Sequence, residues 1–597
     1  MRGGVYHSSH AAALGGVLAV RRFLFRAAFL FLMIDGCLFL YSRKDKLGIQ
    51  KKTVFRFMIL LLLTFCSSIP LVKPYLFSEA HDLRFHLMRI VGLAESFRSY
   101  MFPVRIQQSW LSGHGYAASI FYGDVFLYLP AALYVLGETI QTSYRCYVLL
   151  VNGATVFLSY YCFSKMSNQK TGLVCTAVYS LNLYRLCCID TRAAVGEFSA
   201  MTFLPLILYG IWRVYTLPED VKEHERSWLP ITAGCSGVFL SHIISTEITA
   251  FFLLLVSLIL WKKTFRKKTL LVLFKAIAAT ILLNLWFLVP FLDEMASGNY
   301  VVTSPYAYMA DRLEERGVTI TQLFMGAADT MPLTLGWASM GVLIFWVLFC
   351  CFQKRREGAK KKEYLIIFLC ILSLFMTTKY FPYTWFTEKI PALRMAAKSI
   401  QFPWRFYPVA GLLLSFLLCL ILQKDWMGRR KRTLLAGVLI CLSVWQGLSY
   451  QRTCMNEFSP YYVDWAEDVS TFSVAGGEYL PVDSDGDFVL YEYMKPYLDQ
   501  LTYDTNVISI EDWRREKGAV VVSLTNLATD TQQIEVPLLL YKGYHAITDS
   551  GQELSLSPAN RTGLRWMFRR AFLGVSRWHL GNRGIGGCVK GYRLWHL

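Results

Sequence analysis

Long blocks of apolar residues constrain this chain more than any other feature of its sequence. Most blocks are about 17 to 24 residues long, the length of helix that crosses the ~30 Å hydrocarbon core of a bilayer. Only 17% of the residues are charged, whereas soluble globular chains carry about 25%. We therefore expect a multi-pass membrane protein. The expected spans lie near residues 23–41, 54–76, 144–163, 171–188, 198–215, 229–240, 248–261, 270–292, 335–352, 364–378, 406–422 and 434–448.

The basic residues are placed like those of cytoplasmic loops. The formal net charge is +19, but Lys and Arg occur in short clusters between apolar blocks, as at 262–268, 354–362 and 429–432. Cytoplasmic loops of membrane proteins are enriched in this way. The charge therefore indicates membrane topology rather than a nucleic-acid partner.

One apolar block, 120–136, is ambiguous because it is short and contains Asp124 and Pro130. If it crossed the membrane, every later basic cluster would lie outside; if it lies in the outer leaflet, every cluster lies inside, as the charge rule requires. We therefore predict a long outside loop, 73–142, with helices lying on the membrane. Segment 1–53 has basic residues on both flanks of its apolar block, so its orientation stays open.

The chain changes character after residue 449. Residues 450–560 are polar and contain runs rich in β-branched residues at 519–526 and 533–541, a pattern typical of half-buried strands. We expect a small β-rich extracytoplasmic domain there, after a membrane domain at 54–449. Residues 561–597 are rich in Arg, Gly and Trp without periodicity, and we expect an irregular tail there, from either disorder or an altered reading frame.

Motifs of soluble enzymes do not occur. The 15 cysteines show neither metal-ligand nor disulfide spacing, and we find no phosphate-binding loop, dinucleotide fingerprint or nucleophile elbow. This disfavours ATP-driven transport.

Polar residues instead gather where the spans end on the outer face. They occur in segments 79–89, 113–130, 191–200, 241–247, 292–295 and 401–406. Ionisable residues at a membrane boundary are costly and usually mark a site. The candidates are Asp82, Arg84, His86, Asp124, Arg192, Glu197, His242, Gln401 and Arg405.

Each candidate also has a structural interpretation. Asp82 and His86, at positions i and i+4 of a helix, could hold a divalent metal or activate an acceptor hydroxyl, or could belong to a solvated, self-paired loop. Arg192 and Glu197 could simply pair across a tight turn. Arg405 could anchor a span at the interface, or its guanidinium could bind a phosphate bidentately.

The motifs carry a family resemblance. The segments HDLRFHLMRI, GHGYAASIFYGD, RAAVGEF, SHIIST and QFPWRF resemble those of bacterial membrane proteins labelled 6-pyruvoyl-tetrahydropterin synthase-related and their YfhO-like relatives. The order of a span, an acidic first loop, many spans and a C-terminal outside domain resembles the GT-C superfamily of glycosyltransferases. The resemblance covers about 54–557. Pterin chemistry is disfavoured because no three-histidine zinc site is evident.

The resemblance implies an enzyme of the bacterial plasma membrane that moves a sugar from a polyprenyl-phosphate carrier to a cell-envelope acceptor on the outer face. Asp82 then acts as base or metal ligand, and Arg405 binds the phosphate, with Arg84 and Arg192 as further candidates. Asp124 and Glu197 serve catalysis, as sugar or metal ligands. His86, His242 and Gln401 complete the substrate site. Residues 80 and 81 are Ala and His, so the paired-acid motif of some GT-C enzymes is absent and the need for a divalent metal stays open.

Two other functions remain open. A transporter or flippase of lipid-linked saccharides would need charges near mid-span and paired repeats, and neither is clear. In a non-catalytic envelope assembly protein, the β-rich domain would be the working part.

Overall fold

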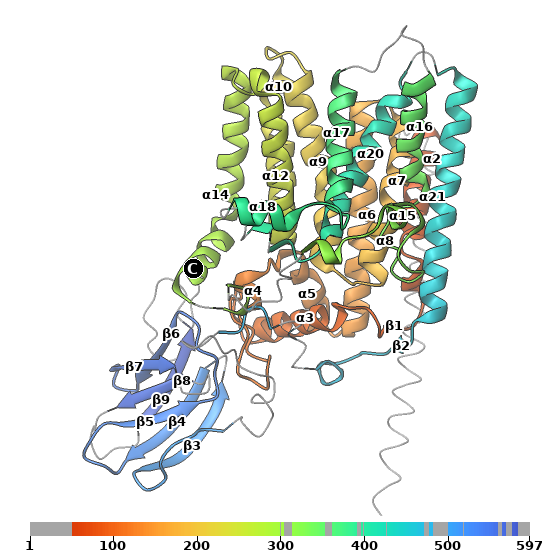
Figure 1. Ribbon diagram of the computed structural model, residues 1–597. Coiled ribbons are helices and arrows are strands. Elements are labelled where there is room, and N and C mark those ends of the chain that lie inside the picture. Colours follow the sequence, from red (N-terminus) through yellow and green to blue (C-terminus); the bar gives the residue numbers. More distant parts are fainter. Residues whose placement is uncertain are drawn as a thin grey trace, which may run out of the picture.

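The computed structural model describes residues 51–298, 300–303, 313–352, 361–390, 396–397, 399–424, 427–470, 474, 477–481, 500–516, 519–558, 564–568 and 576–582. The span expected at 23–41 lies outside these residues. Within them the chain forms a helical bundle followed by a β-sheet domain (Figure 1). The predicted architecture, an all-α membrane domain with a small C-terminal β-rich domain, is confirmed.

Every expected span from 54 to 448 corresponds to at least one helix. The helices are α2 (Lys51–Cys66), α6 (Ile140–Met166), α7 (Gln169–Ser180) with α8 (Leu183–Asp190), α9 (Val195–Thr216), α11 (Trp228–Ser241), α12 (Ile243–Ile259), α14 (Lys267–Ser297), α16 (Trp337–Phe352), α17 (Lys361–Met376), α20 (Tyr407–Ile421) and α21 (Arg429–Glu457).

Fewer of the described helices are long enough to cross a membrane than the number of spans that the sequence predicts. Among the described residues, five helices are long and apolar enough to cross a membrane, or six if α7 and α8, bent by 47°, form one span. Helices such as α16 and α17, each of 16 residues, fall short of the ~20 residues that a straight crossing needs. The expected eleven or twelve spans stay a prediction beyond these.

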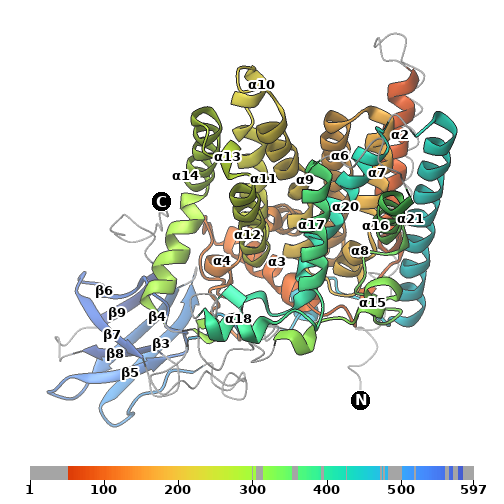
Figure 2. The ribbon, with the colours of Figure 1, turned by 45° about the horizontal axis from the view of Figure 1, so that its top comes forward.

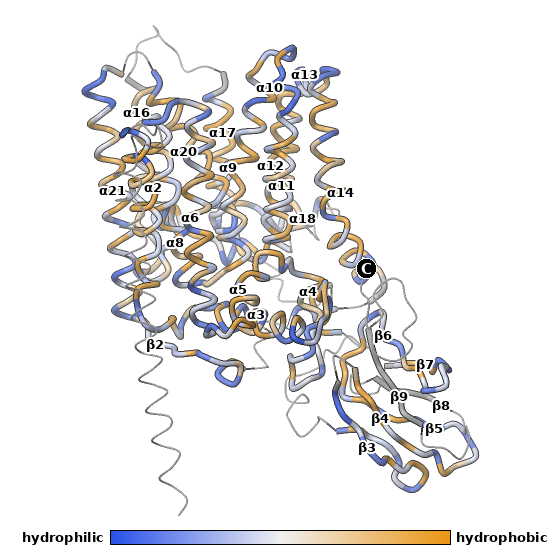
Figure 3. Tube along the Cα trace, turned by 180° about the vertical axis from the view of Figure 1, so that it is seen from behind, coloured by the Kyte–Doolittle hydropathy of each residue, from blue (hydrophilic) through white to orange (hydrophobic). Residues whose placement is uncertain are grey.

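The two ends of the bundle differ in composition. The basic clusters at 262–268 and 429–432 lie at the end that carries α10 (Lys222–Glu225), α13 (Trp261–Thr264) and the first residues of α21 (Figures 1 and 2). Hydrophilic residues gather at both ends of the bundle, with apolar residues between them (Figure 3). This is the pattern expected for a bundle that crosses a membrane.

The opposite end is built from short helices of the first loop. These are α3 (Leu83–Arg98), α4 (Ala118–Phe121) and α5 (Tyr128–Val135), accompanied by the 3-10 turn η2 (Val125–Leu127) (Figure 1). Block 120–136 is thus a set of short helices rather than a span, as the charge rule predicted. The remaining short elements are η1 (Ile69–Val72), η3 (Val301–Thr303), η4 (Leu313–Arg316), α15 (Ile320–Met325), α18 (Tyr383–Lys389), η5 (Pro403–Phe406) and η6 (Ala466–Asp468).

A two-stranded ribbon ties the first loop to the chain that follows the last span. Strand β1 (Leu76–Phe77) pairs antiparallel with β2 (Pro460–Tyr461). The N–H of Ser78 continues this pairing by donating to the carbonyl of Ser459 at 3.1 Å. The ribbon fixes the start of α3 against the bundle end.

The C-terminal domain is a seven-stranded sheet in the order β3-β4-β9-β6-β7-β8-β5, and all its described pairings are antiparallel. It lies beside α4 and the end of α14 (Figure 1). Its strands are β3 (Ile508–Glu516), β4 (Ala519–Asn526), β5 (Gln532–Val536), β6 (Tyr544–Thr548), β7 (Glu553–Pro558), β8 (Leu564–Phe568) and β9 (Ser576–Asn582).

Strands β8 and β9 contradict one expectation from the sequence. They fall in 561–597, where we expected an irregular tail, and β9 lies between β4 and β6 inside the sheet. The runs LRWMF and SRWHL contain the aromatic residues that strands favour. The Arg and Gly residues around these short runs obscured that signal in the sequence.

Candidate active site

The candidate site begins with a backbone contact between two distant segments. The N–H of His81 donates to the carbonyl of Thr191 at 3.1 Å, and the N–H of Asp82 donates to the carbonyl of Arg192 at 2.9 Å. Asp82 is the N-cap of α3, whereas Arg192 lies in the turn between α8 and α9. These two bonds place the first-loop acid beside the RAAVGEF turn.

Glu197 is the centre of the first group of charges. It lies in the first turn of α9, where the positive end of the helix dipole favours a carboxylate. The Nη1 of Arg192 donates to its Oε2 at 2.7 Å, and the hydroxyl of Tyr184 donates to its Oε1. The Nε of Arg405 lies 3.9 Å from the same Oε2. Glu197 is thus a buried, fully engaged anion between two arginines.

Arg405 is held from the other side by the turn that precedes α20. Its Nη1 donates to the carbonyl of Ile400 at 3.0 Å and to Oε1 of Gln401 at 2.9 Å. Gln401 adopts a left-handed conformation, with φ of 63°, that few residues other than glycine favour. The Nε of Arg405 donates no hydrogen bond among the described residues. The guanidinium is therefore oriented but keeps a free donor.

Asp82 is the acid of this group that keeps some contact with solvent. It is half-buried, whereas Glu197 and Arg192 are buried. Burial raises the pKa of the Asp82 carboxyl above its ordinary value, while Arg192, Arg405 and His81 oppose that rise. A carboxyl whose pKa is raised toward the operating pH is a better general base.

A second ion pair lies on the other side of Tyr122. The guanidinium of Arg89 pairs with Oδ1 of Asp124, donates to the carbonyl of Gly123 at 2.8 Å and lies 4.1 Å from the centre of the Tyr122 ring. Its side chain is 0% exposed and that of Asp124 is 2% exposed. The Oδ2 of Asp124 accepts no hydrogen bond among the described residues.

Two histidines, His86 and His242, lie beside these ion pairs, and both are neutral in the folded protein. The Nη1 of Arg89 lies 3.2 Å from Nδ1 of His86, which leaves the proton of His86 on Nε2. Burial lowers the pKa of His86 well below its ordinary value. The Nδ1 of His242 caps α12 by accepting from the N–H of Ser245 at 3.3 Å. Burial, together with Arg405, lowers the pKa of His242 to about 3.

Eight of the nine candidates therefore gather in one group of buried or half-buried residues. Arg84 does not: it is exposed and stacks on the ring of Tyr461, 5.3 Å from the ring centre. We use the name charge cluster for the three arginines and three acids that balance one another, namely Asp82, Arg89, Asp124, Arg192, Glu197 and Arg405. Burying charges in balanced, hydrogen-bonded pairs limits the desolvation penalty.

Three further residues belong to the site but are not among the candidates that the sequence indicates, namely Arg89, Tyr122 and Tyr184. Arg89 had a usable signal, because it lies three residues after His86 between the apolar residues Met88 and Ile90, on the face of α3 that is buried. A cation on a buried helix face needs a partner. The tyrosines had no such signal, because 34 tyrosines occur in the chain.

A metal site would need more ligands than Asp82 and His86 provide. No three His, Cys, Asp or Glu side chains come together as metal ligands within the described ranges. The Nδ1 of His86 faces Arg89, and a cation there competes with a metal. The cofactor thus stays a hypothesis from the sequence.

A match to the model of a protein family shows which family this chain belongs to. The model of the 6-pyruvoyl-tetrahydropterin synthase related domain, described as a membrane protein, matches residues 120–453. This is more than half of the chain. The chain belongs to this family of membrane proteins. The matched region contains Asp124, Arg192, Glu197, His242, Gln401 and Arg405, whereas Asp82 and its loop precede it.

Two further proteins are similar to this member of the family. A protein of Lactococcus lactis subsp. cremoris (strain MG1363), described as uncharacterized, is 22% identical over 563 residues, which are 84% of this chain and 87% of that protein. The crystal structure of ArnT from Cupriavidus metallidurans bound to undecaprenyl phosphate is 10% identical, with 71% of this chain and 77% of ArnT covered at a TM-score of 0.35.

Proposed function

We propose that this multi-pass membrane protein is a glycosyltransferase that moves a sugar from a polyprenyl-phosphate carrier to a cell-envelope acceptor on the outer face. The observation that carries the proposal is that Asp82 and Arg405 both belong to the charge cluster, where the Arg405 guanidinium is near enough to oppose the rise in the pKa of the Asp82 carboxyl. Both are only partly buried, whereas Arg89, Asp124, Arg192 and Glu197 are buried. A base and a phosphate-binding cation would thus be available together to a lipid-linked donor and its acceptor.

Arg405 would bind the phosphate of the donor. A guanidinium binds two phosphate oxygens with parallel N–H groups, and the Nε of Arg405 has no hydrogen-bond partner among the described residues. Glu197 and Gln401 hold the guanidinium in place. Arg192 adds positive potential from 2.7 Å behind Glu197.

Asp82 would act as the general base. The acceptor hydroxyl attacks the anomeric carbon of the sugar, and its proton passes to the Asp82 carboxylate. The bond between that carbon and the phosphate oxygen breaks, and the polyprenyl phosphate leaves with the electron pair. Arg405 stabilises the charge that develops on the departing phosphate.

Glu197 and Asp124 would then position other groups rather than react. Glu197 already accepts from Arg192 and Tyr184, so it has little capacity to take a proton from an acceptor. Asp124 pairs with Arg89 beneath Tyr122. Both residues would therefore be positioning residues rather than catalytic residues.

The test is sugar transfer from radiolabelled polyprenyl-phosphate sugars, supplied as a panel to membranes that contain each variant at matched expression. Asp82→Asn should reduce transfer by about 10² or more, the usual contribution of a positioned base. Arg405→Lys should also lose activity because Lys keeps the charge but not the two-pronged geometry. Asp220→Asn and Arg429→Lys, both exposed near the basic clusters, are the matched controls and should transfer normally.

Full transfer by Asp82→Asn would exclude this residue as the base and leave Asp124 as the better candidate. An absence of transfer by the unmodified protein across all donors would favour the flippase or assembly function. Deleting the β-sheet domain would separate those two, because only the assembly function has its working part there.

A further inference from the structure

A small cavity lies beside the Asp82 loop. Its volume is about 30 Å³, and its walls come from β1, α6, the end of α8 and the chain around Pro70. Most of its lining is apolar, including Phe77, Leu83 and Val148. None of the nine candidate residues lines it. The cavity is therefore a separate feature of the molecule.

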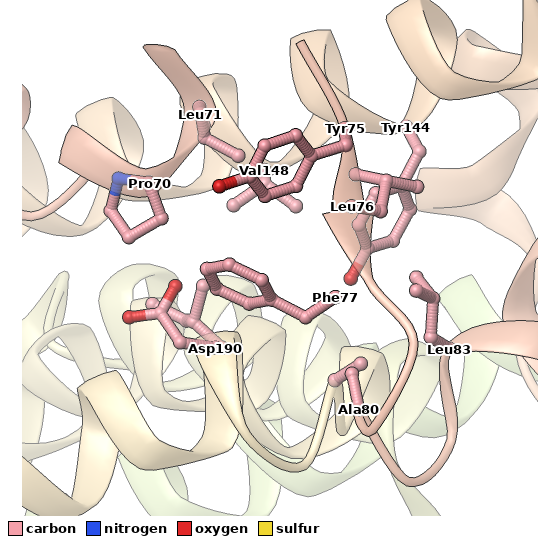
Figure 4. A pocket seen from close by; sticks show the side chains of 12 residues that line it. Pro70, Leu71, Tyr75, Leu76, Phe77, Ala80, Leu83, Tyr144, Val148 and Asp190 are labelled. Atoms are coloured by element: carbon pink, nitrogen blue, oxygen red, sulfur yellow. The ribbon is translucent and has the colours of Figure 1, made fainter. Parts of the chain in front are cut away.

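Two polar groups face this apolar cavity without partners. Asp190 and Tyr144 both line it (Figure 4), and they are 5% and 4% exposed. Neither Oδ2 of Asp190 nor the hydroxyl of Tyr144 has a hydrogen-bond partner within the described part of the chain. A buried carboxylate oxygen without a partner carries a large desolvation cost, which either a proton or a bound cation would remove.

Neither basic residue that lies near Asp190 along the chain pairs with it. Arg192, two residues on, pairs instead with Glu197 at 2.7 Å. Arg185 donates to Oδ1 of Asn152 at 2.7 Å, to the hydroxyl of Thr155 at 3.0 Å and to the carbonyl of Ser180 at 3.2 Å. Its guanidinium is thus occupied at the other end of α8. Asp190 forms no ion pair with any described Lys, Arg or His side chain that would remove the need for a cation.

The position of Asp190 adds a second attraction for a cation. It is the last residue of α8, the second half of the bent α7–α8 pair. The C-terminal end of a helix carries a partial negative charge, and the ends of broken helices are places where membrane proteins bind small cations. The amide of Gln451, which is fully buried, lies beside the Asp190 carboxylate.

We propose that this cavity binds a monovalent cation through the carboxylate of Asp190 and the hydroxyl of Tyr144. A volume of about 30 Å³ accommodates an ion and about one water molecule, because one water needs roughly 10–15 Å³. It is too small for a sugar or a lipid headgroup. The ion links α6 to the end of α8, and so supports the Thr191–Arg192 turn that receives the Asp82 loop.

The experiment uses the full-length protein purified in detergent and does not depend on the proposed enzymatic activity. Its thermal unfolding midpoint is measured in NaCl, KCl and choline chloride at equal ionic strength. The midpoint should rise by a few degrees in Na⁺ or K⁺ relative to choline, because a ligand that binds only the folded state stabilises it. Asp190→Asn should remove this difference, whereas the exposed control Asp293→Asn should retain it.

Equal midpoints in all three salts would overturn the proposal, as would a cation effect that persists in Asp190→Asn. A midpoint that follows pH but not the identity of the cation would mean that Asp190 is held neutral, which also contradicts the site. If Asp190→Asn fails to fold, Tyr144→Phe is the variant that tests the proposal. It should raise the cation concentration of half-maximal effect several-fold, and an unchanged concentration would refute the assignment.

Discussion

The backbone N–H of Asp82 donates a 2.9 Å hydrogen bond to the carbonyl oxygen of Arg192. This bond joins Asp82, in the first loop, to the turn that contains Arg192, the cation of the Arg192–Glu197 ion pair. The position of the acid is thus set by main-chain geometry rather than by its own side chain, for which no cap hydrogen bond is present. The carboxylate is thereby left available for chemistry.

The buried pair of Arg192 and Glu197 should matter for stability far more than an exposed pair of similar geometry. Glu197→Gln leaves Arg192 buried without its counter-charge, which typically costs about 3–5 kcal/mol. The control is Asp512→Asn, which breaks an exposed 2.7 Å contact with Arg514, and exposed pairs contribute about 0–1 kcal/mol. Thermal unfolding in detergent measures both, and similar losses would contradict the burial argument.

Arg89 and Asp124 should be strongly coupled. Each single variant, Arg89→Gln or Asp124→Asn, leaves one buried charge without its partner, whereas the double variant leaves none. The double variant should therefore be more stable than either single variant, with a coupling energy of about 0.5–3 kcal/mol. The same cycle on Arg266 and Glu219, a partly exposed pair at 3.4 Å, serves as the control and should give little coupling. Additive losses at Arg89 and Asp124 would argue against the pair.

Acid should destabilise the protein through its buried histidines. The pKa of His242 is lowered from 6.5 to about 3, so between these values the unfolded chain binds a proton that the folded protein does not. The free energy of unfolding therefore falls as the pH falls below about 6.5. His242→Asn keeps a residue that caps helices well but removes the titration. It should flatten the fall in unfolding midpoint between pH 7 and 4.5, and His86, whose pKa is also lowered by burial, contributes to the slope that remains. An unchanged slope would mean that His242 does not titrate in this way.

The orientation of the bundle can be tested by cysteine accessibility. Arg84 is exposed beside β2, whereas Lys263 and Arg430 are exposed at the opposite end of the bundle. In a background without the exposed Cys441, a membrane-impermeant reagent added to intact cells should label Arg84→Cys. It should label Lys263→Cys and Arg430→Cys only after permeabilisation. Labelling of all three in intact cells would refute the proposed topology.

The sequence predicts the arrangement of this protein better than its detailed contacts. The charge rule correctly assigns block 120–136 to short helices, because the placement of Lys and Arg reports on the whole chain rather than on that block. Arg405 and Glu197 could be recognised as candidates from their boundary positions. Their 3.9 Å contact could not, because 208 positions separate them and only packing brings them together. The Asp190 cavity gave no sequence signal, since one acid at the end of an apolar block has no visible partner.

The β1–β2 ribbon has a consequence for the order in which the protein is made. Leu76 pairs with Tyr461, so the first loop reaches its final support only after the ribosome has synthesised α21 and the membrane has accepted it. Contacts between such distant segments form late because a long loop must close first. The segment that carries Asp82 therefore spends most of translation without the partner strand that anchors it. A nascent chain arrested before residue 460 should expose this loop to protease, whereas a longer nascent chain should protect it.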